Sequence, residues 1–143
     1  MSLDTNKARV RQFFETVDKM GHREAIEYLA TDAAIHIAGL PAPLDRESYV
    51  ELSAMFTQGF SDGRHIIEGQ VAEGDLVTSR GRWLATHTGT FQGIPASGRS
   101  VDFEWARETR FRDGKMVEIY VLFDQLGLMQ QIGALPQPAG AAA

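Results

Sequence analysis

Apolar residues near the start of the chain recur at helical spacing. Val10, Phe13, Phe14 and Val17 follow one another at intervals of three, one and three residues, which places them on one face of a helix. We predict a first helix over about residues 6–20, ended by a glycine, and a shorter second helix directly after it. These two helices form a helical hairpin at the start of the domain.

The pattern becomes extended at residues 33–40, where apolar residues flank His36 and two prolines follow, so we predict a short strand there. Asp45 comes next and is a favoured residue for capping the start of a helix. The apolar residues after it return to the helical period. A third helix is therefore predicted over residues 46–60.

Strand patterns dominate the second half of the chain, in which β-branched and aromatic residues alternate with polar ones and turn residues separate the runs. Asp113-Gly114 is the strongest hairpin signal in the sequence. The predicted strands are 65–72, 76–91, 101–112 and 115–123, and the predicted last helix is 125–132.

The order of these elements predicts an α+β fold, because helices come first and strands follow without regular alternation. We expect a curved antiparallel sheet that wraps around the N-terminal helices and leaves a deep pocket at the mouth of the curve. Residues 1–135 form one domain in this prediction. Residues 136–143 are rich in proline, alanine and glycine and are expected to be a disordered tail.

Composition narrows the classes of function. The chain has 143 residues, a net charge of −5 and no cysteine, which argues against nucleic-acid binding, disulfides and a thiol nucleophile. No run approaches the ~18 apolar residues of a membrane span, no signal peptide begins the chain, and the histidines lack metal-ligand spacing. We expect a cytoplasmic protein that acts on a small molecule, without a metal, nucleic acid or membrane as partner.

Two stretches of the second half carry a family resemblance. Residues 86–98 read THTGTFQGIPASG, and the last strand and helix read FRDGKMVE at 111–118 and DQLGLMQQIG at 124–133. Both stretches resemble segments of the SnoaL-like polyketide cyclases of the NTF2-like superfamily. The helical opening of the chain also agrees with that family.

The resemblance implies an NTF2-like cone with a deep pocket, a homodimer, and chemistry without a cofactor. Characterised cyclases of the family close a ring by an intramolecular aldol reaction with an acidic residue, and Asp124 matches the position of that acid. From the sequence alone, Asp124 also reads as the N-cap of the last helix. An acid at a strand end beside apolar residues can be desolvated, which makes it a stronger base.

Further candidate catalytic residues follow from alternation along the strands. Glu108 and Arg110 point the same way, and the hairpin at Asp113-Gly114 pairs their strand with the one that ends at Asp124. We expect acid, Arg and acid to converge, with Arg110 stabilising an oxyanion. His36 is a candidate proton relay or hydrogen-bond donor, although a lone histidine in an apolar strand is more often a core residue.

The candidate ligand-binding residues are mostly aromatic. Two tryptophans on strands suit an apolar pocket for a ring-shaped ligand, and the histidine lies within the motif that resembles the family. These candidates are Trp83, His87, Trp105, Tyr120 and Met55.

Several functions stay open at this point. The first is a cofactor-free acid–base enzyme, with aldol-type cyclisation nearest to the resemblance. The second is an epoxide hydrolase of the limonene-epoxide hydrolase type, in which Glu108, Arg110 and Asp124 would activate water. A ketosteroid-type isomerase and a non-catalytic ligand-binding or dimerisation module complete the set, because fold alone does not determine function.

Overall fold

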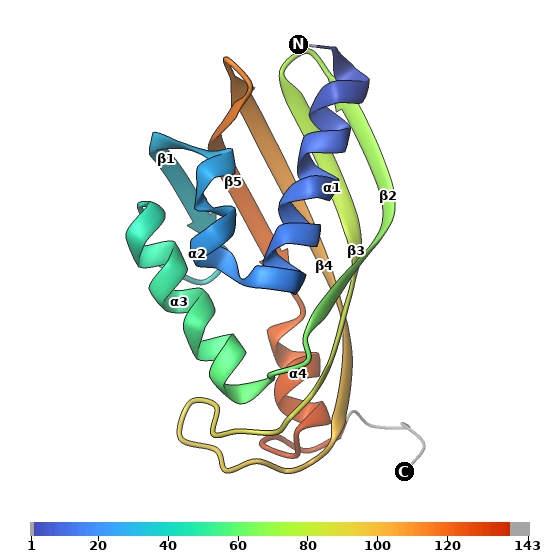
Figure 1. The fold of residues 1–143 in the computed structure, drawn as a ribbon. Helices are drawn as coiled ribbons and strands as arrows, with labels where there is room; N and C mark the ends of the chain where they lie inside the picture. Colours follow the sequence, from blue (N-terminus) through green and yellow to red (C-terminus); the bar gives the residue numbers. More distant parts are fainter. Residues whose placement is uncertain (1, 138–143) are drawn as a thin grey trace.

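The computed structural model describes residues 2–137. Its helices and strands follow the predicted order closely (Figure 1). Residues 138–143 of the expected tail lie outside the described residues. The elements are α1 (Leu3–Met20), α2 (His22–Ala25), the 3-10 turn η1 (Ile26–Tyr28), β1 (Leu29–Ile37), α3 (Arg46–Gly59), β2 (Arg64–Glu73), β3 (Leu76–Thr86), β4 (Ser100–Arg112), β5 (Lys115–Phe123) and α4 (Gln125–Gln131).

The strands form one sheet in the order β1-β5-β4-β3-β2. Strands that follow one another from β2 to β5 pair antiparallel, as predicted. The edge strand β1 instead pairs parallel with β5, a pairing that the prediction of an antiparallel sheet did not include. Two strands joined by a short hairpin turn must pair antiparallel. No such turn joins β1 to β5, so these two strands are free to pair parallel.

The two halves of the hairpin between β4 and β5 meet at the predicted turn. Asp113 and Gly114 both have positive φ angles, 51° and 77°. Those angles suit the tight turns that match the right-handed twist of two paired strands. The turn fixes the register of β4 on β5, in which Glu108 lies opposite Tyr120.

Strand β3 ends earlier than its pattern predicts, at Thr86 rather than near residue 91. The backbone N–H of Thr86 donates to the Asp62 carboxylate at 2.7 Å. The N–H of His87 still donates to the carbonyl of Arg99 beside β4, but those of Thr88 and Gly89 donate to the carbonyl of Gly59 at the end of α3. The backbone therefore leaves the sheet because α3 and the turn after it take up its hydrogen bonds.

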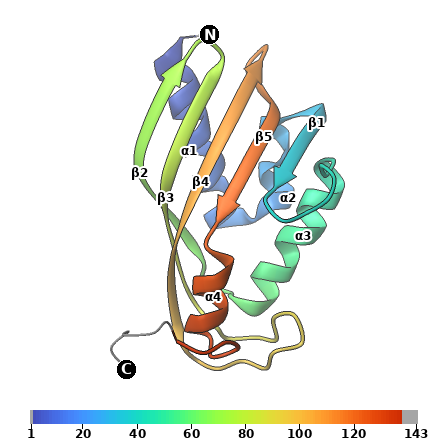
Figure 2. The ribbon, with the colours of Figure 1, turned by 180° about the vertical axis from the view of Figure 1, so that it is seen from behind.

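The helices differ in the side of the sheet that they occupy. The helices α1, α2 and α3 lie against the concave face (Figure 1), and in the view from behind most of the convex face is open, with α4 beside the lower end of β4 (Figure 2). Along β4 the side chains alternate strictly between buried and more exposed positions. Odd-numbered residues of that strand, such as Phe103 and Trp105, face the helices and form part of the core.

Candidate functional site

A cavity of about 350 Å³ lies between the concave face of the sheet and the helices α1 and α3. Its walls are mainly aromatic, which suits a ligand with an apolar ring system. The phenyl, phenol and indole rings that line it are those of Phe14, Tyr49, Phe56, Phe60, Trp83, Phe103, Trp105 and Phe123. The two tryptophans predicted as ligand-binding residues are thus placed in the cavity wall.

Polar side chains enter this cavity from α1, the start of α2, α3 and the strands β2 and β4. Within the part of the chain that the structure describes, Asp18 is the one carboxylate among the lining residues. The other polar side chains of the lining are Lys19, His22, Tyr49, Ser53, Thr57, Ser61, His65 and Arg107.

His65 and Asp18 form a hydrogen-bonded pair at this cavity. The Nδ1 atom of His65 lies 2.7 Å from Oδ1 of Asp18, and the backbone N–H of His65 donates to Oδ2 at 2.8 Å. A carboxylate accepts hydrogen bonds, so Nδ1 carries a proton, and in the neutral form of the ring Nε2 then has the free lone pair. The ring also packs on Phe14 at 4.5 Å between centroids. The pair therefore presents an oriented imidazole base.

Arg107 lies on β4 and is only 3% exposed. Its Nε–H donates to the Thr109 hydroxyl at 3.3 Å, and Nη1 donates to the Tyr49 hydroxyl at 3.4 Å. The guanidinium also lies over the rings of Phe13 and Phe14, at 4.4 and 5.1 Å. Burial lowers the pKa of Arg107, and the contact with Tyr49 opposes that shift. A guanidinium keeps its proton even so.

His22 opens α2 and faces the same cavity. Burial lowers the pKa of His22 from 6.5 to about 3, with smaller contributions from His65 in its protonated form and from the positive charge of Arg107. Its imidazole is therefore neutral near pH 7, and one nitrogen donates while the other accepts. The ring packs edge-on against Tyr49 at 5.2 Å.

All four predicted catalytic residues lie outside the cavity, so the expectation that they converge there is wrong. Glu108 and Arg110 occupy the even positions of β4, and alternation turns their side chains to the convex face. Arg110 pairs there with Asp75 at 2.7 Å. His36 also lies on that face, 3.3 Å from Glu118.

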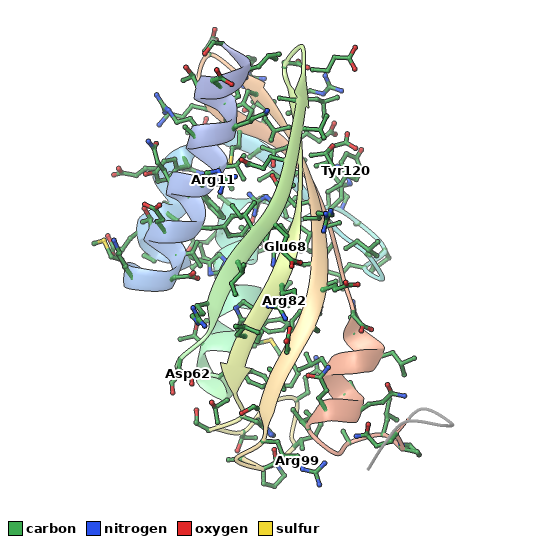
Figure 3. All side chains as sticks on the ribbon, turned by 90° about the vertical axis from the view of Figure 1, so that its right-hand side faces the viewer. Arg11, Asp62, Glu68, Arg82, Arg99 and Tyr120 are labelled. Atoms are coloured by element: carbon green, nitrogen blue, oxygen red, sulfur yellow. The ribbon has the colours of Figure 1, made fainter. Side chains whose placement is uncertain are left out.

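Two of the predicted ligand-binding residues are exposed rather than in the cavity. Tyr120 is 46% exposed and stacks on His36 with ring centroids 4.2 Å apart. Figure 3 shows Tyr120 on the side of the sheet away from Arg11 on α1. Met55 is 42% exposed on α3. Neither residue is part of the cavity lining.

His87 is fully buried behind the cavity wall rather than in it. Its ring stacks on Phe60 at 5.2 Å, and Nδ1 accepts from the backbone N–H of Ser97. The residue therefore holds the loop after β3 against the core.

Asp124 is the N-cap of α4, which confirms the structural interpretation of this residue. Its side chain accepts from the backbone N–H of Gly127 at 2.8 Å. A Cβ atom on Gly127 would overlap the Asp124 carboxylate, so glycine leaves room for this cap. Asp124 is exposed and is not among the residues that line the cavity.

Within residues 2–137, no three His, Cys, Asp or Glu side chains gather into a group that could hold a metal ion. In the same described part, none of the helices combines the length and apolar character needed to cross a bilayer.

Comparisons with known proteins agree on one family. The sequence model of the SnoaL-like polyketide cyclases matches residues 8–132. The aklanonic acid methyl ester cyclase DnrD of Streptomyces peucetius is 30% identical over 117 residues, which span 80% of this chain and 79% of DnrD.

Solved structures share the fold. AclR of Streptomyces galilaeus superposes with a TM-score of 0.89 at 24% identity, over 97% of this chain and 87% of AclR. IdmH of Streptomyces antibioticus superposes with a TM-score of 0.82 at 28% identity, over 90% of this chain and 98% of IdmH. Both superpositions extend over nearly the whole chain.

Proposed function

The chain belongs to the SnoaL-like polyketide cyclase family, and from that premise we propose that it closes a ring in a polyketide-type substrate by an intramolecular aldol reaction. The observation that carries the proposal is the His65–Asp18 pair at an aromatic cavity. An aldol closure needs a base to remove a proton next to a carbonyl, and it needs a site that holds the folded chain in place.

His65 is the proposed base. Asp18 holds its Nδ1–H, so Nε2 accepts the proton from the substrate carbon and an enolate forms. The enolate carbon then attacks a second carbonyl of the same molecule, and the new alkoxide takes a proton back. Asp18 orients the imidazole and stabilises its charged form, as an acid partner does in other His–Asp pairs.

The remaining lining supplies position and hydrogen bonds. The aromatic walls exclude water from a flat polyketide, and exclusion of water strengthens every electrostatic contact inside. Neutral His22 and the hydroxyl of Ser53 are available to bond carbonyl oxygens. This chemistry uses side chains of the chain itself.

An epoxide hydrolase of the acid–Arg–acid type receives no support from the geometry. Glu108 and Arg110 lie on the convex face, and Asp124 caps α4. Asp18, the carboxylate of the cavity, already accepts two hydrogen bonds from His65. Cyclisation by an imidazole base therefore remains the better supported reaction.

The test is ring closure of aklanonic acid methyl ester, the compound in the name of the relative, and of its free acid. Ring closure by aldol addition keeps the mass, so product is followed by chromatographic retention and absorbance. We expect His65→Gln to lower the rate by about 10² to 10⁴, and Asp18→Asn to lower it less. His36→Gln, on the convex face, is the matched control and should keep the wild-type rate. A His65→Gln variant as fast as wild type would place the base elsewhere.

A further inference from the structure

Arg107 carries a buried positive charge that no acid of the protein balances. The side chain is 3% exposed, and within residues 2–137 no carboxylate lies at ion-pair distance from it. Taking a charge out of water costs several kcal/mol unless a partner compensates it. The rings of Phe13 and Phe14 offset part of this cost by cation–π contact. If position 107 served only to pack the core, an apolar residue there would make the fold more stable.

The guanidinium of Arg107 also has N–H donors that are not used within the described protein. It has five N–H groups, and its contacts within the described chain are those to the Thr109 hydroxyl, the Tyr49 hydroxyl and the sulfur of Met116. The contact to sulfur, at 3.6 Å, goes to a weak acceptor. At least two N–H groups therefore have no acceptor in the described protein, and Arg107 lines the cavity.

The surroundings of Arg107 favour an anion over a neutral group. His22 and Arg107 are close enough that the charge of Arg107 helps to lower the pKa of His22. Asp18 is the one carboxylate among the described lining residues, and both of its oxygens bond to His65. The end of the cavity at Arg107 therefore combines apolar walls with an uncompensated cation.

We propose that Arg107 is an anion subsite and that the natural substrate carries a carboxylate on its ring system, which Arg107 binds. A carboxylate matches the planar fork of a guanidinium and supplies the missing acceptors. This inference rests on the proposed function in one respect, namely that the cavity is the substrate site. It makes Arg107 the residue that selects the substrate, while His65 performs the proton transfer.

The experiment is isothermal titration calorimetry of the full chain with 2-naphthoate and with 2-naphthamide. The two probes share the ring system, and only the first is an anion. We expect wild type to bind 2-naphthoate at least about tenfold more tightly than the amide, because hydrogen bonds to charged groups contribute that much. Arg107→Met should remove this preference. Arg82→Met, on the convex face, is the matched control and should retain it.

Two results would overturn the anion subsite. One is equal affinity of wild type for acid and amide, which needs no variant and so does not depend on the folding of Arg107→Met. The other is an acid preference that survives in both Arg107→Met and Arg107→Gln. His65→Gln separates this inference from the proposed function, since it should bind 2-naphthoate as wild type does while losing turnover. Acid preference without any His65-dependent turnover would refute the base and leave the subsite standing.

Discussion

His22 shows how one buried imidazole ties the stability of the fold to pH. Its pKa falls from 6.5 to about 3, with burial as the main cause. Above pH 6.5 the ring is neutral in the folded and the unfolded chain and has no effect on stability. As the pH falls from 6.5 toward 3, His22 is protonated in the unfolded chain but stays neutral in the folded chain. The free energy of unfolding therefore decreases, by about 2 kcal/mol at pH 5 from this residue.

Replacement of His22 by asparagine should remove that loss. We expect the free energy of unfolding of wild type to drop between pH 7 and pH 5 by about 2 kcal/mol more than that of His22→Asn. Urea unfolding at the two pH values measures both drops. Other titrating groups are common to the two proteins, so the difference isolates His22. Equal drops would mean that the imidazole is accessible to protons in the folded state.

The residues of the site were predicted less well than the fold. The cause is that the wrong set of alternate residues on β4 and β5 was assigned to the cavity face. Counting by twos from Asp124 assigns Glu118 and Tyr120 to the cavity. Asp124, however, has left the strand to cap α4, and the cavity face of β5 carries Val121 and Phe123. A count from Phe103 and Trp105, the buried aromatics of β4, would have selected Arg107.

The proposed base, His65, and its partner Asp18 had no local signal in the sequence. Asp18 ends an amphipathic helix and His65 begins a strand, 47 residues later. Each reads alone as an ordinary surface residue. Their contact depends on how α1 crosses the concave face of the sheet, and spacing along the chain does not specify that crossing.

At the scale of elements, α4 depends on the cap at its first turn. Asp124 accepts from the N–H of Gly127, so its loss leaves a helix donor without a partner. We expect Asp124→Ala to lower the free energy of unfolding by about 1 kcal/mol, and Asp124→Asn to change it little because asparagine caps equally well. Urea unfolding of the two variants measures the difference. Turnover should persist in both.

The same pair of variants tests the role that family resemblance gives to Asp124. If Asp124→Asn keeps its stability and loses turnover, the carboxylate takes part in the reaction and the cap is its second role. If turnover survives in Asp124→Asn, the acid serves only the helix.

Elements were predictable where local chemistry decides them. Asp45 caps α3, and Asp113 and Gly114 turn the last hairpin, because these residue types match those backbone positions. The end of β3 was not predictable, since Thr86 to Gly89 have a good strand composition. The backbone N–H groups there donate to Asp62 and Gly59, which are distant in sequence, and these hydrogen bonds stop the strand.

At the scale of the molecule, the curved sheet separates two environments. Its concave face and the helices enclose the aromatic cavity with His65 and Arg107. Its convex face carries ion pairs such as Arg82 with Asp102 and Arg110 with Asp75. Figure 3 shows Arg82 and Glu68 on neighbouring strands of that sheet. The charges outside are screened by water and contribute little, whereas the charge inside must be offset by its surroundings.

That difference predicts opposite effects for two arginines. Methionine has nearly the volume of arginine and no charge, and at position 107 it would pack beside Phe13 and Met116. Buried ionic groups replaced by apolar residues of similar volume often leave a protein equally or more stable. We expect Arg107→Met to raise the free energy of unfolding by about 1 kcal/mol, and Arg82→Met to change it by less than about 0.5 kcal/mol. Urea unfolding at pH 7 gives both values.

If Arg107→Met is more stable than wild type and also loses its preference for the acid, the two results support the same interpretation. Natural proteins keep destabilising groups where function needs them, and the charge of Arg107 would then be held for the substrate. A loss of more than about 2 kcal/mol in Arg107→Met would have the contrary meaning. The guanidinium would then bind Tyr49 and Thr109 together as part of the core, and weaker ligand binding would follow from a damaged cavity rather than from a missing cation.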